Sequence, residues 1–114
     1  AGASWRSLPN GQKGYMTFGP YVQDLPAGVT TAVFFLLVDN VTAGGNVGRV
    51  EVYDYDRNTL LASRTIWRNH FRAPWAWTPF ALTWYHVPSS NRIEFRVYTE
   101  GNALLYFDNV LVLK

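Results

Sequence analysis

The sequence lacks the residues and segments that define several common protein classes. It has no cysteine, which excludes disulfide bonds, thiolate zinc sites and cysteine catalysis. Its longest apolar run, residues 32–38, is seven residues long, whereas a membrane-spanning helix needs about 20. The first residues show no charged segment followed by an apolar one, so we expect any secretion signal to have been removed or never to have been present.

The chain is also poor in the groups that catalysis requires. Its 114 residues include two histidines and eight carboxylates, with no nucleophile elbow, no histidine pair at metal spacing and no glycine-rich phosphate loop. Asp54 and Asp56 are close in sequence, but a turn places them on one side rather than across a cleft, as a glycosidase pair requires. His86 shares the inward parity of Trp84, which favours a sheltered strand-end residue over a base. We therefore predict a binding protein, not an enzyme.

Lysine is scarce, whereas arginine and aromatic residues are abundant. Lys and Arg together number ten, of which eight are Arg, and the net charge is only +2. Aromatic residues make up 17% of the chain, with five Trp, seven Tyr and seven Phe. This exceeds what the core of one small domain needs, and exposed aromatic surface is typical of a binding site.

Short β-branched and aromatic runs alternate with Gly, Pro, Asn and Asp, which predicts seven or eight strands in a single domain of residues 1–114. We expect Asp108 and Asn109 to divide the last strand. An all-β, two-sheet antiparallel sandwich follows from this pattern. The expected strands are residues 17–21, 30–39, 47–54, 60–67, 77–86, 92–99 and 103–113.

Alternation along these strands separates inward from outward side chains. The strands over 49–54 and 92–98 have apolar inward faces and charged outward faces, which is typical of a solvated sheet with ion pairs. The strand over 30–38 is apolar on both faces, and Phe35 points outward with Val33 and Leu37. If this strand, the one ending at Trp67 and the one carrying Tyr85 share a sheet, its outer face is aromatic and must be covered by something.

The segment 66–77 concentrates residues that suit sugar rings. It holds three Trp, two Arg, one His and one Asn. The C–H face of a sugar packs on indole, while its hydroxyls pair with Arg, Asn or His. In an extended chain, Trp75 and Trp77 would lie on the same side, about 6.5–7 Å apart. The alternative is that one or both plug the end of the sandwich, and for Trp5 and Trp84 a packing role is favoured.

The order of several short motifs resembles secreted jelly-roll carbohydrate-binding modules of the galactose-binding-like type. The likeness runs from about Gly14 to the C-terminus. It implies a jelly-roll fold and a non-catalytic module that holds a polysaccharide, attached to a secreted carbohydrate-active enzyme outside the cell. The motifs are Phe18-Gly19-Pro20-Tyr21, Leu25-Pro26-Ala27-Gly28 before a strand ending Val38-Asp39-Asn40, residues 61–66 and 94–98, and Tyr106-Phe107-Asp108-Asn109-Val110.

The same resemblance implies a structural calcium, for which Asp108 in the last strand would be a ligand. Calcium is bound by six to eight oxygens. Asp39 is the one further carboxylate that we predict as a ligand. A separate run, Asp54-x-Asp56-x-Asn58, copies the opening of an EF-hand loop but has Thr59 and Thr65 where that loop needs Gly and Glu. We therefore predict a hairpin turn for this run.

Three functions remain open on the sequence. The leading one is carbohydrate binding, with a polysaccharide or oligosaccharide as the partner. A protein–protein or domain interface on the apolar face is the second, and single-stranded nucleic-acid binding is the third, which the low net charge disfavours. The expected ligand-binding residues are Phe35, Trp67, Arg68, Asn69, His70, Arg72, Trp75, Trp77 and Tyr85, and the expected metal ligands are Asp108 and Asp39.

Overall fold

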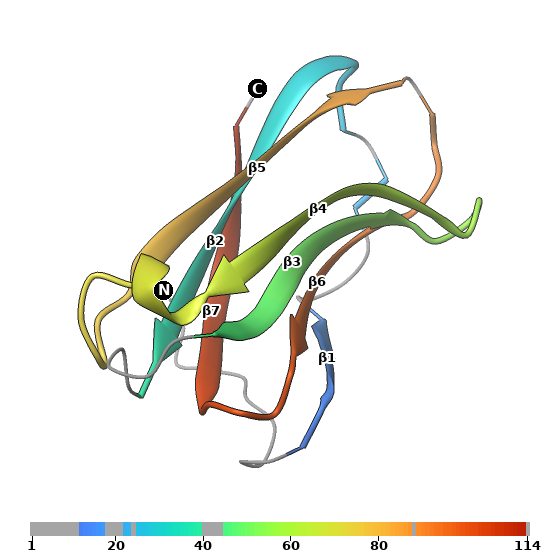
Figure 1. Cartoon of the computed structure of the whole chain (residues 1–114). Helices are drawn as coiled ribbons and strands as arrows, with labels where there is room; N and C mark the ends of the chain where they lie inside the picture. Colours follow the sequence, from blue (N-terminus) through green and yellow to red (C-terminus); the bar gives the residue numbers. More distant parts are fainter. Residues whose placement is uncertain (1–11, 18–21, 24, 40–44, 88, 114) are drawn as a thin grey trace.

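The computed structural model describes residues 12–17, 22–23, 25–39, 45–87 and 89–113. Within these ranges the chain forms seven strands and one short 3₁₀ helix (Figure 1). No helix in this part of the chain is long and apolar enough to cross a membrane. The elements are β1 (Gly14–Thr17), β2 (Gly28–Val38), β3 (Asn46–Asp54), β4 (Thr59–Trp67), η1 (Arg68–His70), β5 (Thr78–His86), β6 (Ile93–Thr99) and β7 (Leu105–Leu113).

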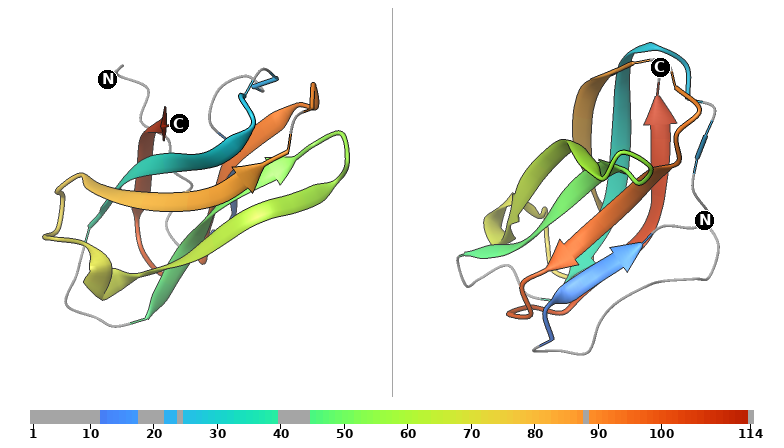
Figure 2. Two further views of the ribbon diagram at one scale, coloured as in Figure 1. Left: turned by 90° about the horizontal axis from the view of Figure 1, so that it is seen from above. Right: turned by 90° about the vertical axis from the view of Figure 1, so that its right-hand side faces the viewer.

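The strands form two antiparallel sheets in two layers, as Figure 2 shows from two further sides. One sheet has the order β1-β6-β3-β4 and the other the order β5-β2-β7. The pairs β3–β4, β2–β5 and β1–β6 are nested within one another, so the chain winds as one long folded hairpin. This is the winding of a jelly roll, and the predicted all-β sandwich is confirmed.

Two strand predictions differ from the structure. The first strand was expected over 17–21, whereas β1 covers Gly14–Thr17 and residues 18–21 lie outside the described part. Asp108 and Asn109 do not end a strand, because β7 continues through them. The register changes there instead, since Phe34 pairs with Val110 but Leu36 pairs with Phe107, and β7 therefore carries a β-bulge.

The core lies between the inward faces of the sheets. Its largest side chains include Phe34, Phe80, Phe95 and Phe107, each less than 2% exposed. Phe34 on β2 meets Phe95 on β6 across the layers, with ring centroids 6.2 Å apart. The inward parity predicted for β5 and β6 is confirmed by their alternating burial, because side chains of period two place every second residue in the same layer.

Most charged side chains on the outward face of the four-stranded sheet pair with one another. Glu51 points outward as predicted but is only 2% exposed, because Arg49 and Arg96 cover it. Arg96 lies between the rings of Tyr53 and Tyr15, at 3.9 and 4.6 Å from their centroids, and Arg49 lies 4.1 Å from that of Tyr98. The hydrogen bond with Glu51 raises the pKa of Arg49 above its ordinary value. These contacts engage the charges of this face internally.

Candidate functional site

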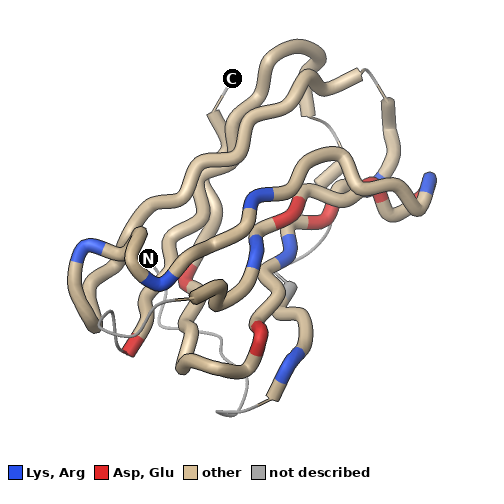
Figure 3. Tube along the Cα trace, viewed as in Figure 1, with Lys and Arg blue, Asp and Glu red and all other residues tan. Residues whose placement is uncertain are grey.

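The outward face of β2 and β5 contains no charged residue. Figure 3 shows both strands free of Lys, Arg, Asp and Glu, whereas the other sheet and its hairpin carry both signs of charge. Exposure reaches 67% at Val29 and 68% at Tyr85. An uncharged apolar surface of this kind is typical of a binding face. We call it the platform, and its residues are Val29, Thr31, Val33, Phe35, Pro79, Ala81, Thr83 and Tyr85.

A hollow of about 300 Å³ opens at one end of the platform. It is lined by Phe35, Trp77, Asp108 and Asn109. The β-bulge in β7 explains the last two, since a bulge leaves an extra residue unpaired and redirects side chains. Two aromatic rings, a carboxylate and an amide therefore meet at one open surface, although they come from β2, β7 and the loop before β5.

Arg72 holds Trp77 in place. Its guanidinium donates a hydrogen bond to the carbonyl of Trp77, and its backbone N–H donates to Thr78 Oγ1 at 3.4 Å. Thr78 Oγ1 in turn donates to the carbonyl of Ala76. Arg72 is exposed and positions the loop that carries Trp77, and its predicted contact with a ligand stays a prediction.

Trp75 lies against Tyr106 at the start of β7. Its φ of 59° is left-handed, so the extended segment predicted for Trp75 and Trp77 is wrong. The backbone N–H of Trp75 donates to Val38 O at 2.8 Å, and its ring centroid is 5.9 Å from that of Tyr106. A left-handed non-glycine residue stores strain, and here a hydrogen bond and a ring contact hold it. Its side chain is still 55% exposed.

Tyr85 marks the opposite end of the platform. It pairs with Val29, whereas Phe35 pairs with Pro79, six residues away along the strand. At the usual rise of an antiparallel strand, this is about 20 Å. Small side chains cover the space between them, including Thr31 and Thr83, whose hydroxyls are 2.8 Å apart. Phe35 and Tyr85 thus share one face as predicted, but no single sugar ring can touch both.

The residues at the end of β4 lie apart from the platform. Trp67 belongs to the four-stranded sheet, so the prediction that it shares a sheet with Phe35 and Tyr85 is wrong. The reason is that β4 follows β3 as a hairpin and stays in the layer of β3. Arg68 is 6% exposed and donates to Asn102 O at 2.8 Å, which makes it structural. Asn69 and His70 are exposed on η1, beside Trp67.

The two predicted metal ligands do not converge. The Asp39 carboxylate accepts a hydrogen bond from Leu104 N, which joins the end of β2 to the start of β7. Asp108 lies four residues after Leu104, in the hollow. Nowhere in the described ranges do three or more His, Asp or Glu side chains gather as a metal site would require. Calcium binding at Asp108 and Asp39 stays a prediction.

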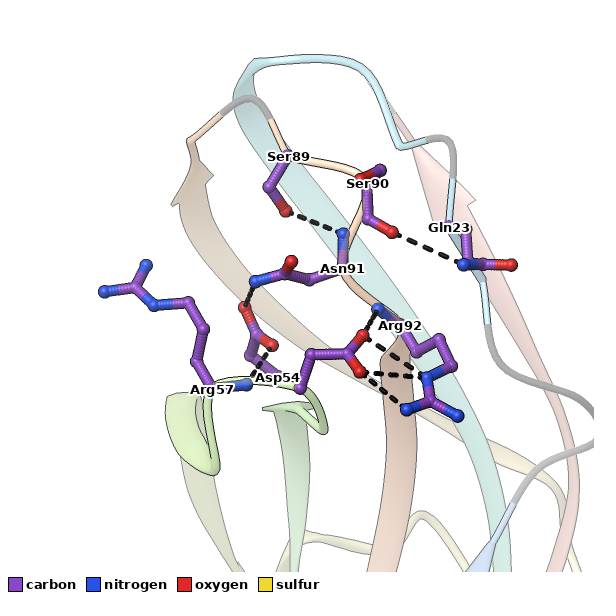
Figure 4. Close-up of polar contacts among 8 residues, drawn as sticks. Gln23, Asp54, Arg57, Ser89, Ser90, Asn91 and Arg92 are labelled. Carbon is purple, nitrogen blue, oxygen red and sulfur yellow. Dashed lines mark hydrogen bonds and ion pairs between the residues drawn. The ribbon is translucent and has the colours of Figure 1, made fainter.

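The acidic run after β3 forms a hairpin turn, as predicted. Asp54 Oδ1 accepts a hydrogen bond from Arg57 N at 3.0 Å, and Asn58 has the left-handed φ of 51° that asparagine tolerates (Figure 4). Asp56 forms an ion pair with Arg92 at 2.6 Å, and these hydrogen bonds lower the pKa of the Asp56 carboxyl. The carboxylates of this run therefore lock the hairpin to the start of β6.

Sequence reasoning missed Asn109 as a ligand-binding candidate. It stands beside Asp108; the pair was expected to interrupt a strand, and of the two only Asp108 was given a binding role, as a calcium ligand. A polar pair inside an otherwise apolar strand was the available signal, since such pairs often mark a bulge. No protein-family model matches the chain, and the search of curated proteins finds no match. The candidate site is therefore defined by the residues that meet in the hollow.

Proposed function

We propose that this protein binds carbohydrate without catalysis, with the hollow as the main subsite. The convergence of Phe35, Trp77, Asp108 and Asn109 carries the proposal. A sugar ring packs its C–H face on aromatic rings, while its neighbouring hydroxyls donate to a carboxylate and both donate to and accept from an amide. A carboxylate among aromatic side chains gives up part of its hydration, and hydroxyls of a bound sugar would replace it.

The platform favours a neutral chain of several rings over a single sugar. It extends about 20 Å from the hollow, and its two strands carry no charged side chain; Arg64 of β4 reaches its edge, where it donates to the carbonyl of Ala81 at 3.0 Å. The abundance of arginine left an acidic polysaccharide open, but no cation lines the hollow, Arg68 is buried and Arg72 holds Trp77. A shallow face also orders flexible hydroxyls and displaces water, so we expect micromolar or weaker affinity for short oligosaccharides.

The test compares Trp77, which lines the hollow, with Trp67, which ends a strand of the other sheet. Trp77→Ala should weaken binding about tenfold or more, the equivalent of about 1.4 kcal/mol, in calorimetric titrations with a panel of soluble neutral polysaccharides. Trp67→Ala is the matched control, because Trp67 is 44% exposed on the other sheet. It should bind like the wild type. Equal losses in both variants, or no binding of any glycan by the wild type, would contradict the proposal.

A protein interface on the same platform is the second candidate. Val29 on β2 and Leu111 and Leu113 on β7 are exposed by 67%, 49% and 47%, and an aliphatic patch suits a protein partner better than a sugar. Light scattering separates the candidates, since a glycan-binding monomer stays at 13.0 kDa at micromolar concentration. A larger mass that returns to 13.0 kDa in Leu111→Lys would favour assembly instead.

The resemblance to secreted carbohydrate-binding modules carries two further proposals. One is a location outside the cell, and the other is attachment to a carbohydrate-active enzyme. The hollow supports them only indirectly, because a weak, shallow glycan site is most useful when it holds an attached enzyme near its polymer.

A further inference from the structure

A second cavity, which we call the end pocket, lies where the platform ends at Tyr85. Its volume is about 130 Å³. The β3–β4 hairpin supplies one side and the chain after β5 supplies the other, so the pocket joins the two sheets at one end of the sandwich. Its lining residues are Asp54, Arg57, Leu61, Tyr85, His86, Val87, Ser89 and Asn91.

Hydrogen bonds hold the polar wall of the end pocket (Figure 4). Asp54 is 3% exposed, and its Oδ2 accepts a hydrogen bond from Asn91 Nδ2 at 3.0 Å. Its Oδ1 accepts from Arg57 N, and Asn91 N donates to Ser89 Oγ at 3.1 Å. Each bond fixes a side chain that also faces the cavity. The wall is therefore preorganised, which lowers the entropy that a ligand must remove.

His86 adds a hydrogen-bond donor to this wall. The imidazole is 3% exposed, and its Nδ1 lies 3.3 Å from Trp84 Nε1. An indole N–H can only donate, so His86 Nδ1 accepts and the ring carries its proton on Nε2. No residue in the described ranges is hydrogen-bonded to that Nε2. This nitrogen is not among the fully buried unpaired polar atoms of the described residues, and His86 lines the cavity, so its N–H can donate to a ligand or water there.

The rest of the lining offers an aromatic ring, apolar side chains and a cation, which are groups that can contact one side of a sugar ring. Tyr85 offers an exposed ring and a hydroxyl, and Leu61 and Val87 offer apolar surface. The Arg57 guanidinium has no hydrogen-bond or ion-pair partner among the described residues. The cavity has room for about four water molecules at roughly 30 Å³ each, which suits the hydroxyl-bearing side of one ring rather than a chain.

We infer that the end pocket binds the terminal ring of a neutral saccharide whose following rings lie along the platform toward Trp77. The inference rests on the proposed function. Donors from His86, Arg57 and Ser89 and acceptors from Asp54 and Asn91 would meet the free hydroxyls that only a terminal ring presents together. Because the wall that Asp54 supplies comes from the opposite sheet, the chain stops there, and this protein recognises chain ends.

The experiment follows the indole N–H signals of the ¹⁵N-labelled full chain by NMR. The Trp84 signal reports the end pocket, because its N–H is hydrogen-bonded to His86. The Trp77 signal reports the hollow. The probes are methyl glycosides of glucose, galactose, mannose and xylose, and soluble oligosaccharides of the same sugars. We expect one methyl glycoside to shift Trp84, and its oligosaccharide to shift both Trp84 and Trp77.

The outcomes separate the inference from the proposed function. If an oligosaccharide shifts Trp77 while Trp84 stays fixed at saturation, carbohydrate binding stands and the end pocket is wrong. If neither signal moves with any probe, both fail. Arg57→Ala should weaken binding of the methyl glycoside about tenfold, as expected for one charge-assisted hydrogen bond. Lys13→Ala, an exposed cation beside β1, is the control, and equal affinities in the two variants would also overturn the inference.

Discussion

Asp108 has no hydrogen-bond or ion-pair partner among the described residues, although it stands partly buried on β7. A carboxylate in such a place gives up hydration without internal compensation. It is therefore free to accept hydrogen bonds from a ligand. Asp39, the other carboxylate predicted to bind metal, accepts from Leu104 N and contributes to the fold.

These two aspartates should respond differently to removal. Asp108→Ala should reduce glycan affinity about tenfold, because a hydrogen bond to a charged group contributes about 1.5–3 kcal/mol, and should leave the melting temperature unchanged. Asp39→Ala should lower the melting temperature and leave the affinity unchanged. Calorimetric titration and thermal melts measure both. The reverse pattern would show that Asp108 is structural. A melting temperature that rises with calcium and falls with a chelator would favour the metal site.

Glu51 is the residue on which the charged face depends. Its carboxylate accepts hydrogen bonds from both Arg49 and Arg96, the latter at 2.7 Å. Glu51→Gln keeps the shape but removes the charge partner of Arg49 and leaves Arg96 only its ion pair with Glu94. We expect the free energy of unfolding to fall by about 2 kcal/mol, less than for a fully buried pair because the arginines are partly exposed. Urea denaturation measures this, and an unchanged midpoint would contradict it.

At the scale of elements, the β3–β4 hairpin is attached to β6 through Asp56 and Arg92. Hydrogen bonds from the side chain and backbone of Arg92 lower the pKa of Asp56. The folded state therefore resists protonation of Asp56. Its contribution to stability is complete above the unfolded pKa of about 3.9 and is lost as the pH falls through the lower folded value.

Asp56→Asn tests this acid dependence. The variant should lose stability relative to the wild type at neutral pH, and the difference should shrink as the pH falls from about 4, the unfolded pKa, through the lower pKa of the folded carboxyl. Thermal melts from neutral to acidic pH follow the effect. Because Asp56 is exposed, the effect should be small and should weaken with salt. A constant difference across the pH range would show that the ion pair is not its cause.

The loop between β4 and β5 is a second element whose conformation matters. The sequence pattern predicted it as extended, and the left-handed backbone at Trp75 instead turns that residue toward Tyr106. Trp77 lines the hollow, with Arg72 at its carbonyl. Of the two tryptophans predicted to form one binding surface, only Trp77 lines the hollow, because the left-handed φ of Trp75 directs that residue elsewhere.

Across the whole molecule, charge is divided between the sheets. The four-stranded sheet holds an internally paired layer of arginine and glutamate, whereas β2 and β5 present no charge. A ligand on the platform therefore meets little electrostatic attraction. This disfavours nucleic acid, for which arginine must reach phosphates.

Salt dependence tests this division directly. Binding of a neutral glycan should change less than about twofold between 50 and 500 mM salt, because no counterions are released. Binding of single-stranded DNA, measured as a parallel arm, should be absent or should fall steeply over the same range. Fluorescence titrations follow both. Salt-sensitive DNA binding tighter than any glycan would favour the nucleic-acid alternative.

Much of the fold could be predicted because strand signals are local. Alternation identified the strands from β2 to β7 and the inward faces of β5 and β6, and turn residues identified the β3–β4 hairpin. The candidate site was only partly predictable. Phe35, Trp77, Tyr85 and Asp108 lie on the platform or in its hollow, but Trp67 and Arg68 do not. Their position in a Trp-rich segment carried no information about the sheet to which each belongs.

The sequence by itself determined the strands, the turn after Asp54 and the side of each strand that faces inward, because each depends on residues within a few positions of one another. Only the tertiary structure decided that Phe35, Trp77, Asp108 and Asn109 would meet. Their meeting depends on strand order, a bulge in β7 and the loop at Trp75, and these follow from packing across the two sheets rather than from local pattern.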